Sequence, residues 1–88
     1  MSEKLENELI NQRDSNGERT GLWKDCYWSN RNLWSEGNFV DGKKTGLWKY
    51  YYINGNLQWE GNFVDGKDTG LWKYYNREGQ LNKLISYV

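Results

Sequence analysis

The sequence predicts an all-β protein, a single-layer antiparallel β-meander of tandem β-hairpin repeats of about 24 residues. Three observations predict this fold. Residues 37–60 and 61–84, aligned without gaps, share 16 of 24 positions, which is far too many for chance. Asp-Gly and Asn-Gly pairs mark tight turns between aromatic and β-branched stretches. The chain of 88 residues also has 10 glycines, no alanine and no proline, a composition that disfavours helices and suits uninterrupted strands.

A third, more divergent copy of the repeat lies upstream. The motif TGLW at residues 20–23 recurs at 45–48 and 69–72. The alignment needs one residue inserted between Trp23 and Leu33. The predicted organisation is an N-terminal cap or partly disordered segment at 1–15, three repeats within 16–84 (16–36, 37–60 and 61–84), and the end of a capping strand at 85–88.

Each repeat contains two turn signals. One is an Asp-Gly pair, at 41–42 and 65–66, and the other is the pair 54–55 or 78–79. Such pairs supply the positive φ that tight hairpin turns require. One repeat therefore contributes two strands, and the array contains six or seven. We expect strands near 20–28, 32–40, 45–53, 56–64, 69–76 and 80–87.

Strand alternation predicts which residues share a face. It places Trp48, Tyr50 and Tyr52 on one face and Leu47, Lys49 and Tyr51 on the other. The tryptophans of successive repeats then form a spaced ladder, and glycines at 37 and 61 give a large ring room to lie flat across the sheet. The ladder is Trp23, Trp48 and Trp72, and the residues expected to fill its gaps are Leu33, Phe39, Leu57, Phe63 and Leu81.

The two ends of the array allow more than one interpretation. Residues 2–12 form either a short helix with Leu5 and Leu9 on one side, or a partly disordered segment with a strand at 9–14. The tail LNKLISYV is typical of a terminal strand tucked under the sheet. Alternatively, an uncovered edge pairs with a second copy and gives a homo-oligomer.

Composition excludes several classes of function. The 12 basic and 12 acidic residues balance to a net charge of zero, which argues against nucleic-acid binding and against strong membrane binding. The absence of histidine excludes His-based catalytic triads and His-containing metal sites. Cys26 is the only cysteine and no signal-peptide pattern is present, so we expect a cytoplasmic protein. We expect no metal, no cofactor and no enzymatic activity.

Polar motifs in the repeats have structural explanations. Asp41 and Asp65 stand in Asp-Gly turns, and the turn conformation that Asp-Gly favours explains why aspartate occurs there. The segments GKKTG and GKDTG lack the spacing of a phosphate-binding loop. Glu36 and Glu60 are expected to pair across strands with Lys49 or Lys73, for a fraction of a kcal/mol each.

The aromatic residues fall into two groups. The repeated rings Trp23, Trp48, Trp72, Tyr51 and Tyr75 are expected to form the core of a sheet that is poor in aliphatic residues. The rings that do not recur in every copy are not demanded by the scaffold, and they are therefore the candidate contact surface, although packing under a cap would also explain them. The predicted partner-binding residues are Trp28, Arg31, Trp34, Tyr52 and Trp59.

Residues 46–70 follow the pattern G-x-W-x-x-Y-Y-x-N-G-x-L-x-x-E-G-x-F-x-D-G-K-x-x-G. This pattern resembles the bacterial MORN repeat (membrane occupation and recognition nexus) of YwqK-like, antitoxin-like proteins. The resemblance covers residues 16–84 and is weakest in the first copy, where Arg31 occupies the place of the turn glycines 55 and 79. It implies a non-enzymatic hairpin array that neutralises a partner protein by direct binding.

We therefore expect a protein-binding repeat module of the antitoxin, immunity or inhibitor type. A small-ligand or glycan-binding aromatic platform is an alternative, because stacked rings also hold sugars, bases and quaternary amines. Choline- and glucan-binding modules of cell walls carry similar Gly-Trp and Tyr-Tyr hairpins. Their repeat is shorter, and they are secreted. A self-associating structural component is the other alternative.

Overall fold

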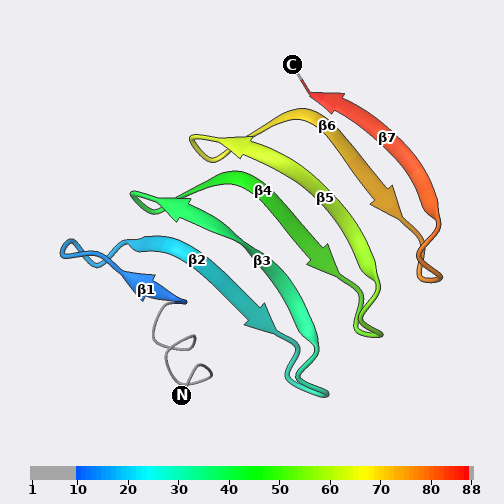
Figure 1. Ribbon diagram of the computed structural model, residues 1–88, viewed down its shortest axis with the longest axis horizontal. Helices are drawn as coiled ribbons and strands as arrows, with labels where there is room; N and C mark the ends of the chain where they lie inside the picture. The colour runs from blue at the N-terminus through cyan, green and yellow to red at the C-terminus, as the bar shows by residue number, and fades with distance from the viewer. Residues whose placement is uncertain (1–9, 88) are drawn as a thin grey trace.

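The computed structural model describes residues 10–87, which form one open antiparallel sheet of seven strands in sequence order (Figure 1). The all-β, single-layer meander is therefore confirmed, and the ends of its last six strands lie within two residues of those predicted. No helix occurs in the described part of the chain, so none there is long and apolar enough for a membrane crossing. The strands are β1 (Gln12–Arg13), β2 (Arg19–Cys26), β3 (Leu33–Val40), β4 (Lys43–Tyr51), β5 (Leu57–Val64), β6 (Lys67–Tyr75) and β7 (Leu81–Tyr87).

Two kinds of turn alternate along the meander. At the first kind, Asp41 and Gly42 both adopt positive φ, 52° and 77°, and connect residues that face each other directly. At the second kind the connection is longer, and the Tyr52 amide donates to the Asn56 carbonyl. There only Gly55 has a positive φ, so the expectation of positive φ for Asn-Gly is met by the glycine and not by Asn54. The Asn54 side chain instead accepts a hydrogen bond from the amide of Asn56.

Strands β4 and β6 bend sharply at a glycine of the TGLW motif. Between the pairs Glu36–Lys49 and Asn38–Thr45 the ladder advances two residues on β3 but four on β4. Gly46, inside this irregularity, has a φ of 70°. The bend brings the Trp48 ring over Gly37, where a Cβ atom would lie 2.1 Å from the ring. The glycines predicted to give the rings room therefore do so, and the same arrangement places Trp72 over Gly61.

The buried core consists of aromatic residues on one face, which we call the core face. Phe39 packs edge-on against Trp48 at a centroid distance of 5.1 Å, and Phe63 does the same against Trp72. The predicted tryptophan ladder with intervening phenylalanines is thus confirmed. The buried hydrophobic residues are Trp23, Phe39, Trp48, Phe63 and Trp72.

The leucines expected to fill gaps in the ladder do not join this core. Leu33 and Leu57 are only half-buried, and Leu81 is exposed. Each is the first residue of its strand, next to a bulge that shifts the register. Because the bulge interrupts the simple alternation of faces, counting residues from the tryptophan wrongly assigned these leucines to the ladder.

Tyr51 and Tyr75, expected in the core, contact glutamates instead. The Tyr51 hydroxyl donates to Glu36, and the Tyr75 hydroxyl donates to Glu60 at 2.8 Å. These residues lie on the opposite face, which we call the outer face. The register does place Lys49 between Glu36 and Glu60. Within the described residues, however, the ion pair that forms is Lys24–Glu36 at 4.0 Å.

The β2 edge of the sheet is covered at its start. Strand β1 pairs with the first residues of β2, and the Asn11 side chain continues the ladder by bonding both the amide and the carbonyl of Lys24. Strand β1 falls within the predicted strand at 9–14. The predicted helix at 2–12 lies mostly outside the described residues, and residues 10–12 are not helical.

Strand β7 occupies the other edge of the sheet. Its turn, residues 76–80, repeats the hydrogen bonding of the turn at 52–56 and keeps β7 in the plane beside β6 (Figure 1). The prediction that this strand tucks under the sheet is therefore wrong.

Candidate functional site

A groove of about 770 Å³ opens on the core face of the first repeat. It lies between β2, β3 and β4 and extends to the turn that joins β2 to β3. Its floor includes Ser35 and Trp48, which are only 3% and 2% exposed. The aromatic side chains along it are Tyr27, Trp28, Trp34, Phe39, Trp48 and Tyr50.

The groove exists because the first repeat has small side chains where the second has large ones. In the second repeat Tyr50 and Trp59 face each other on adjacent strands and stack at 3.9 Å. The corresponding pair in the first repeat is Asp25 and Ser35. Neither of these side chains can cover the sheet as two rings do, so a hollow remains.

Trp34 forms one wall of the groove. It is the extra residue of a bulge, because Asp25 pairs with Ser35 and the next residue of β2, Cys26, pairs with Leu33. Its ring lies edge-on to Tyr50 at 6.0 Å and remains 44% exposed. The later repeats have glutamine or asparagine at this bulge position, so Trp34 is particular to the first repeat.

Trp28 stands on the enlarged turn at 27–32, which contains the residue inserted relative to the later repeats. Its side chain is 100% exposed. Arg31 takes the place of the turn glycines, and its φ of 65° is left-handed like theirs. The inserted residue therefore makes this turn one residue wider than the turn at 52–56, and Arg31 keeps the backbone conformation of the turn glycines.

The wide turn is held in place by the neighbouring turn. The side-chain amides of Asn30 and Asn32 donate to the Ile53 carbonyl at 2.9 and 3.0 Å. The Tyr27 hydroxyl donates to the Tyr51 carbonyl at 2.7 Å. Because these bonds fix the turn that carries Trp28, its ring is presented on an ordered support.

Two cations lie over rings at the groove. The Arg19 guanidinium is 4.6 Å from the Trp23 ring centre, and the Lys44 ammonium is 4.9 Å from that of Trp48. Lys44 also donates a hydrogen bond to the Tyr50 hydroxyl at 2.6 Å. Asp25 is the acidic residue of the groove lining.

The structure brings some of the predicted contact residues together and separates others. Trp28 and Trp34 line the groove, and Arg31 lies in the same turn as Trp28. Tyr52 donates its hydroxyl to the Tyr75 carbonyl, which is the role of Tyr27 one repeat earlier. Trp59 stacks between Tyr50 and Trp72 and so belongs to the covered part of the core face.

The groove is also lined by four residues that the sequence did not indicate as contact residues: Arg19, Asp25, Ser35 and Lys44. A usable signal was present, because Asp25 and Ser35 align with Tyr50 and Trp59 of the second repeat. Aligning the repeats and noting where an aromatic residue of one copy is replaced by a small residue in another indicates the position of the groove.

Three tyrosines outside the groove hold their protons strongly. Burial and the bond to Glu36 raise the pKa of Tyr51. Burial, together with the neighbouring Tyr87 hydroxyl, raises the pKa of Tyr74 to about 12. The bond to Glu60 raises the pKa of Tyr75. All three are therefore neutral at physiological pH, and Tyr51 and Tyr75 donate hydrogen bonds to the glutamates.

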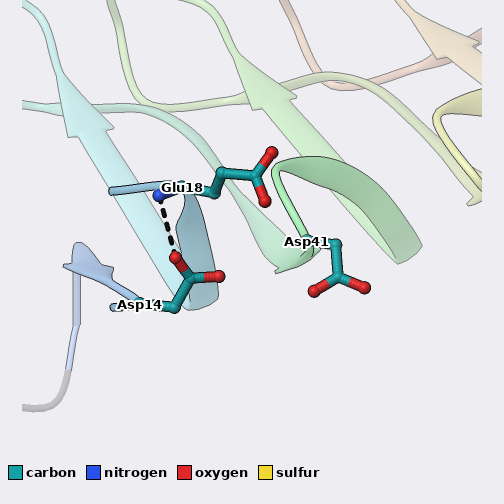
Figure 2. Close-up of side chains that lie close together, drawn as sticks. All are labelled: Asp14, Glu18 and Asp41. Atoms are coloured by element: carbon teal, nitrogen blue, oxygen red, sulfur yellow. Dashed lines mark hydrogen bonds between the residues drawn. The ribbon is translucent and has the colours of Figure 1, made fainter. Parts of the chain in front are cut away.

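A separate acidic group lies where the β1–β2 turn meets the β3–β4 turn (Figure 2). One carboxylate oxygen from each of Asp14, Glu18 and Asp41 lies within 4.8 Å of the others. Asp14 already accepts one hydrogen bond from the amide of Glu18 (Figure 2) and another from the amide of Asn16, and this bonding shapes the turn. Oxygen ligands of this kind suit Ca²⁺ or Mg²⁺. The turn hydrogen bonds account for Asp14, and the other two carboxylates are exposed.

No family model, no curated protein and no solved structure matches the sequence. The resemblance to bacterial MORN repeats therefore stays a prediction.

Proposed function

We propose that the protein is a non-enzymatic binding module that contacts another protein through the groove of its first repeat. The observation that carries this proposal is a fully exposed tryptophan, Trp28, on an ordered turn beside a ring-lined hollow. Tryptophan and tyrosine are enriched among residues that dominate protein–protein binding energy. A rigid support lowers the entropy lost when such a side chain is immobilised by a partner.

The chemistry of the groove supports binding rather than catalysis. Its ionisable groups include Arg19, Lys44 and Asp25, and the two cations already lie against rings. General acid–base work needs a proton-transferring group at hydrogen-bond distance from a second reacting group. The close pair of such groups in the described groove lining is Lys44 and Tyr50, at 2.6 Å, and both lie against rings of the core face.

We further propose a role of the antitoxin, immunity or inhibitor type in the cytoplasm. The MORN-like residue pattern supports this role, because the resemblance implies a hairpin array that neutralises a partner protein by direct binding. The location is supported by Cys26, a lone and exposed thiol that suits a reducing compartment.

Capture from the native cell tests the proposal. The wild-type protein, expressed at its native level and purified gently, is expected to bring down one protein in stoichiometric amount. Trp28→Ala is expected to lower its recovery at least tenfold, the size of effect that hot-spot tryptophans show. Leu71→Ala is the matched control, because Leu71 is also an exposed apolar residue but lies outside the groove. Recovery of no protein, or equal recovery with Trp28→Ala, would contradict the proposal.

Two other functions have one supporting observation each. The groove volume lies in the range of small-molecule sites, which supports a small-ligand or glycan platform. Titration of tryptophan fluorescence with sugars, choline and nucleotides tests it, and a flat response across the panel removes it. The β7 edge supports self-association, which is refuted by a strict monomer in sedimentation over a wide concentration range.

A further inference from the structure

We propose that the groove takes an arginine side chain of the partner protein, whose guanidinium pairs with Asp25 and stacks on Trp34 or Trp28. The inference rests on the proposed function, because it names the chemistry that would be recognised at that same groove. Three features of the described residues support it. They are the cations that lie over other rings of the core face, the unpaired carboxylate of Asp25, and the size of the groove.

The chain repeatedly places a cation over the rings of its core face. Arg19 lies over Trp23 and Phe39, at 4.6 and 5.5 Å from their ring centres. In the second repeat the Lys44 ammonium lies within 5.2 Å of three rings, and in the third Lys83 lies 5.2 Å from the Tyr74 ring. Such contacts are attractive because the face of an aromatic ring carries negative electrostatic potential.

Trp28 and Trp34 are exposed tryptophans without such a cation. Among residues 10–87 the two other tryptophans without one, Trp59 and Trp72, stack on each other in the core face, whereas no lysine or arginine lies over the exposed rings of Trp28 and Trp34. They are also the two tryptophans that the first repeat has and the later repeats lack at the corresponding positions. The open faces of these rings are therefore available to a cation from another molecule.

Asp25 supplies the negative charge for such a guest. It is half-buried, it faces Ser35 and the Trp34 bulge across the ladder, and it lines the groove. No described residue forms an ion pair or a hydrogen bond with its carboxylate. A partly desolvated carboxylate without a partner gains more from a charged donor than a fully hydrated one does.

Arginine fits this combination better than lysine does. Its planar guanidinium forms two parallel hydrogen bonds to a carboxylate and stacks on an aromatic face at the same time. The groove, at about 770 Å³, has room for the side chain together with its flanking backbone. Arg19 and Lys44 leave it available, because each is directed at rings of the repeat core.

A peptide titration tests the guest directly. Acetyl-Gly-Arg-Gly-amide is added to the ¹⁵N-labelled protein, and the indole N–H signals of Trp28 and Trp34 are followed by NMR. We expect saturable shifts with this peptide and none with the citrulline peptide, which has the same shape without the charge. Asp25→Asn, which keeps the size of the side chain, is expected to weaken binding at least tenfold. Shifts that are absent, equal for citrulline, or unchanged in Asp25→Asn would overturn the inference.

The captured partner separates this inference from the proposed function. If Trp28→Ala weakens partner binding but Asp25→Asn does not, the groove binds a protein but the arginine inference is wrong. If the peptide binds through Asp25 but no partner is captured, the guest chemistry stands and the proposed function fails. The double variant Asp25→Tyr/Ser35→Trp provides an independent check, because it copies the ring pair of the second repeat into the first. It is expected to abolish binding of the arginine peptide, and unchanged binding would overturn the inference.

Discussion

Gly61→Ala should destabilise the protein, although backbone considerations alone favour the substitution. Gly61 lies in β5 without a positive φ, so alanine adopts its conformation freely and would stabilise by about 0.4–1 kcal/mol through the unfolded state. The obstacle is Trp72, whose ring lies flat on the glycine. A Cβ atom at residue 61 would lie 2.1 Å from Cδ2 of that ring.

The size of the effect follows from how far the ring must move. Ordinary contact begins near 3.4 Å, so the Trp72 ring must retreat by about 1.3 Å. It is only 4% exposed and packs against Trp59 at 4.7 Å and Phe63 at 5.1 Å. Overpacking costs about 1–3 kcal/mol, and each weakened aromatic pair costs a further 0.5–1.5 kcal/mol or so. With two weakened pairs, and after the backbone gain, we expect a net loss of about 1–6 kcal/mol.

Urea unfolding, followed by far-ultraviolet circular dichroism, measures this loss. Gly61→Ala should cost much less in a Trp72→Leu background, because the clashing ring is then absent. Gly79→Ala is the matched control, since its Cβ meets nothing within 4 Å and only its φ of 89° opposes alanine. A neutral or stabilising Gly61→Ala, or an equal cost in both backgrounds, would refute the account of ring packing.

Three further predictions follow from local geometry. Arg31→Gly should stabilise the protein by about 1 kcal/mol, because Arg31 holds a left-handed φ of 65° where later repeats have glycine; an unchanged urea midpoint would refute this. Asn11→Ala should speed hydrogen exchange of the Lys24 amide, because the Asn11 side chain accepts the hydrogen bond from that amide. Gln12→Ala leaves this bond in place and is the control. Equal exchange rates in the wild type and Asn11→Ala would contradict the prediction. Stability should fall as pH rises from about 10 towards 12, because the pKa of Tyr74 is near 12 in the folded chain and near 10 in the unfolded chain. Below pH 10 both states are protonated and the contribution is fully present; Tyr74→Phe should reduce the fall in the urea midpoint, and an equal fall would count against it.

Most of the fold was predictable because the same turn and strand residues recur in each repeat. Two copies of Asp-Gly place positive φ at the same point of each hairpin, and Gly37 and Gly61 mark where a ring crosses the strand. Errors arose where regular alternation stops. Leu81 was predicted to fill a gap in the core but is exposed. The bulge next to it changes which face it occupies, and no residue type in the sequence indicates that bulge.

The candidate site was predictable only in part. Trp28 and Trp34 stood out because they are additions to the repeat. Asp25 and Ser35 did not, because a hollow consists of side chains that are missing, and their facing positions became clear only from the register. Tyr52 could not be told from a contact residue, since its hydrogen bond to the Tyr75 carbonyl depends on how two turns lie side by side.

Hydrogen exchange of the protein with and without its captured partner tests the central claim most directly. The claim is that the first repeat, where the ring pair of the second repeat is absent, is the surface that binds. We predict that the partner slows exchange most strongly at residues 27–34, which form the wide turn and the start of β3. Protection confined to β6 and β7, with residues 27–34 unchanged, would contradict it.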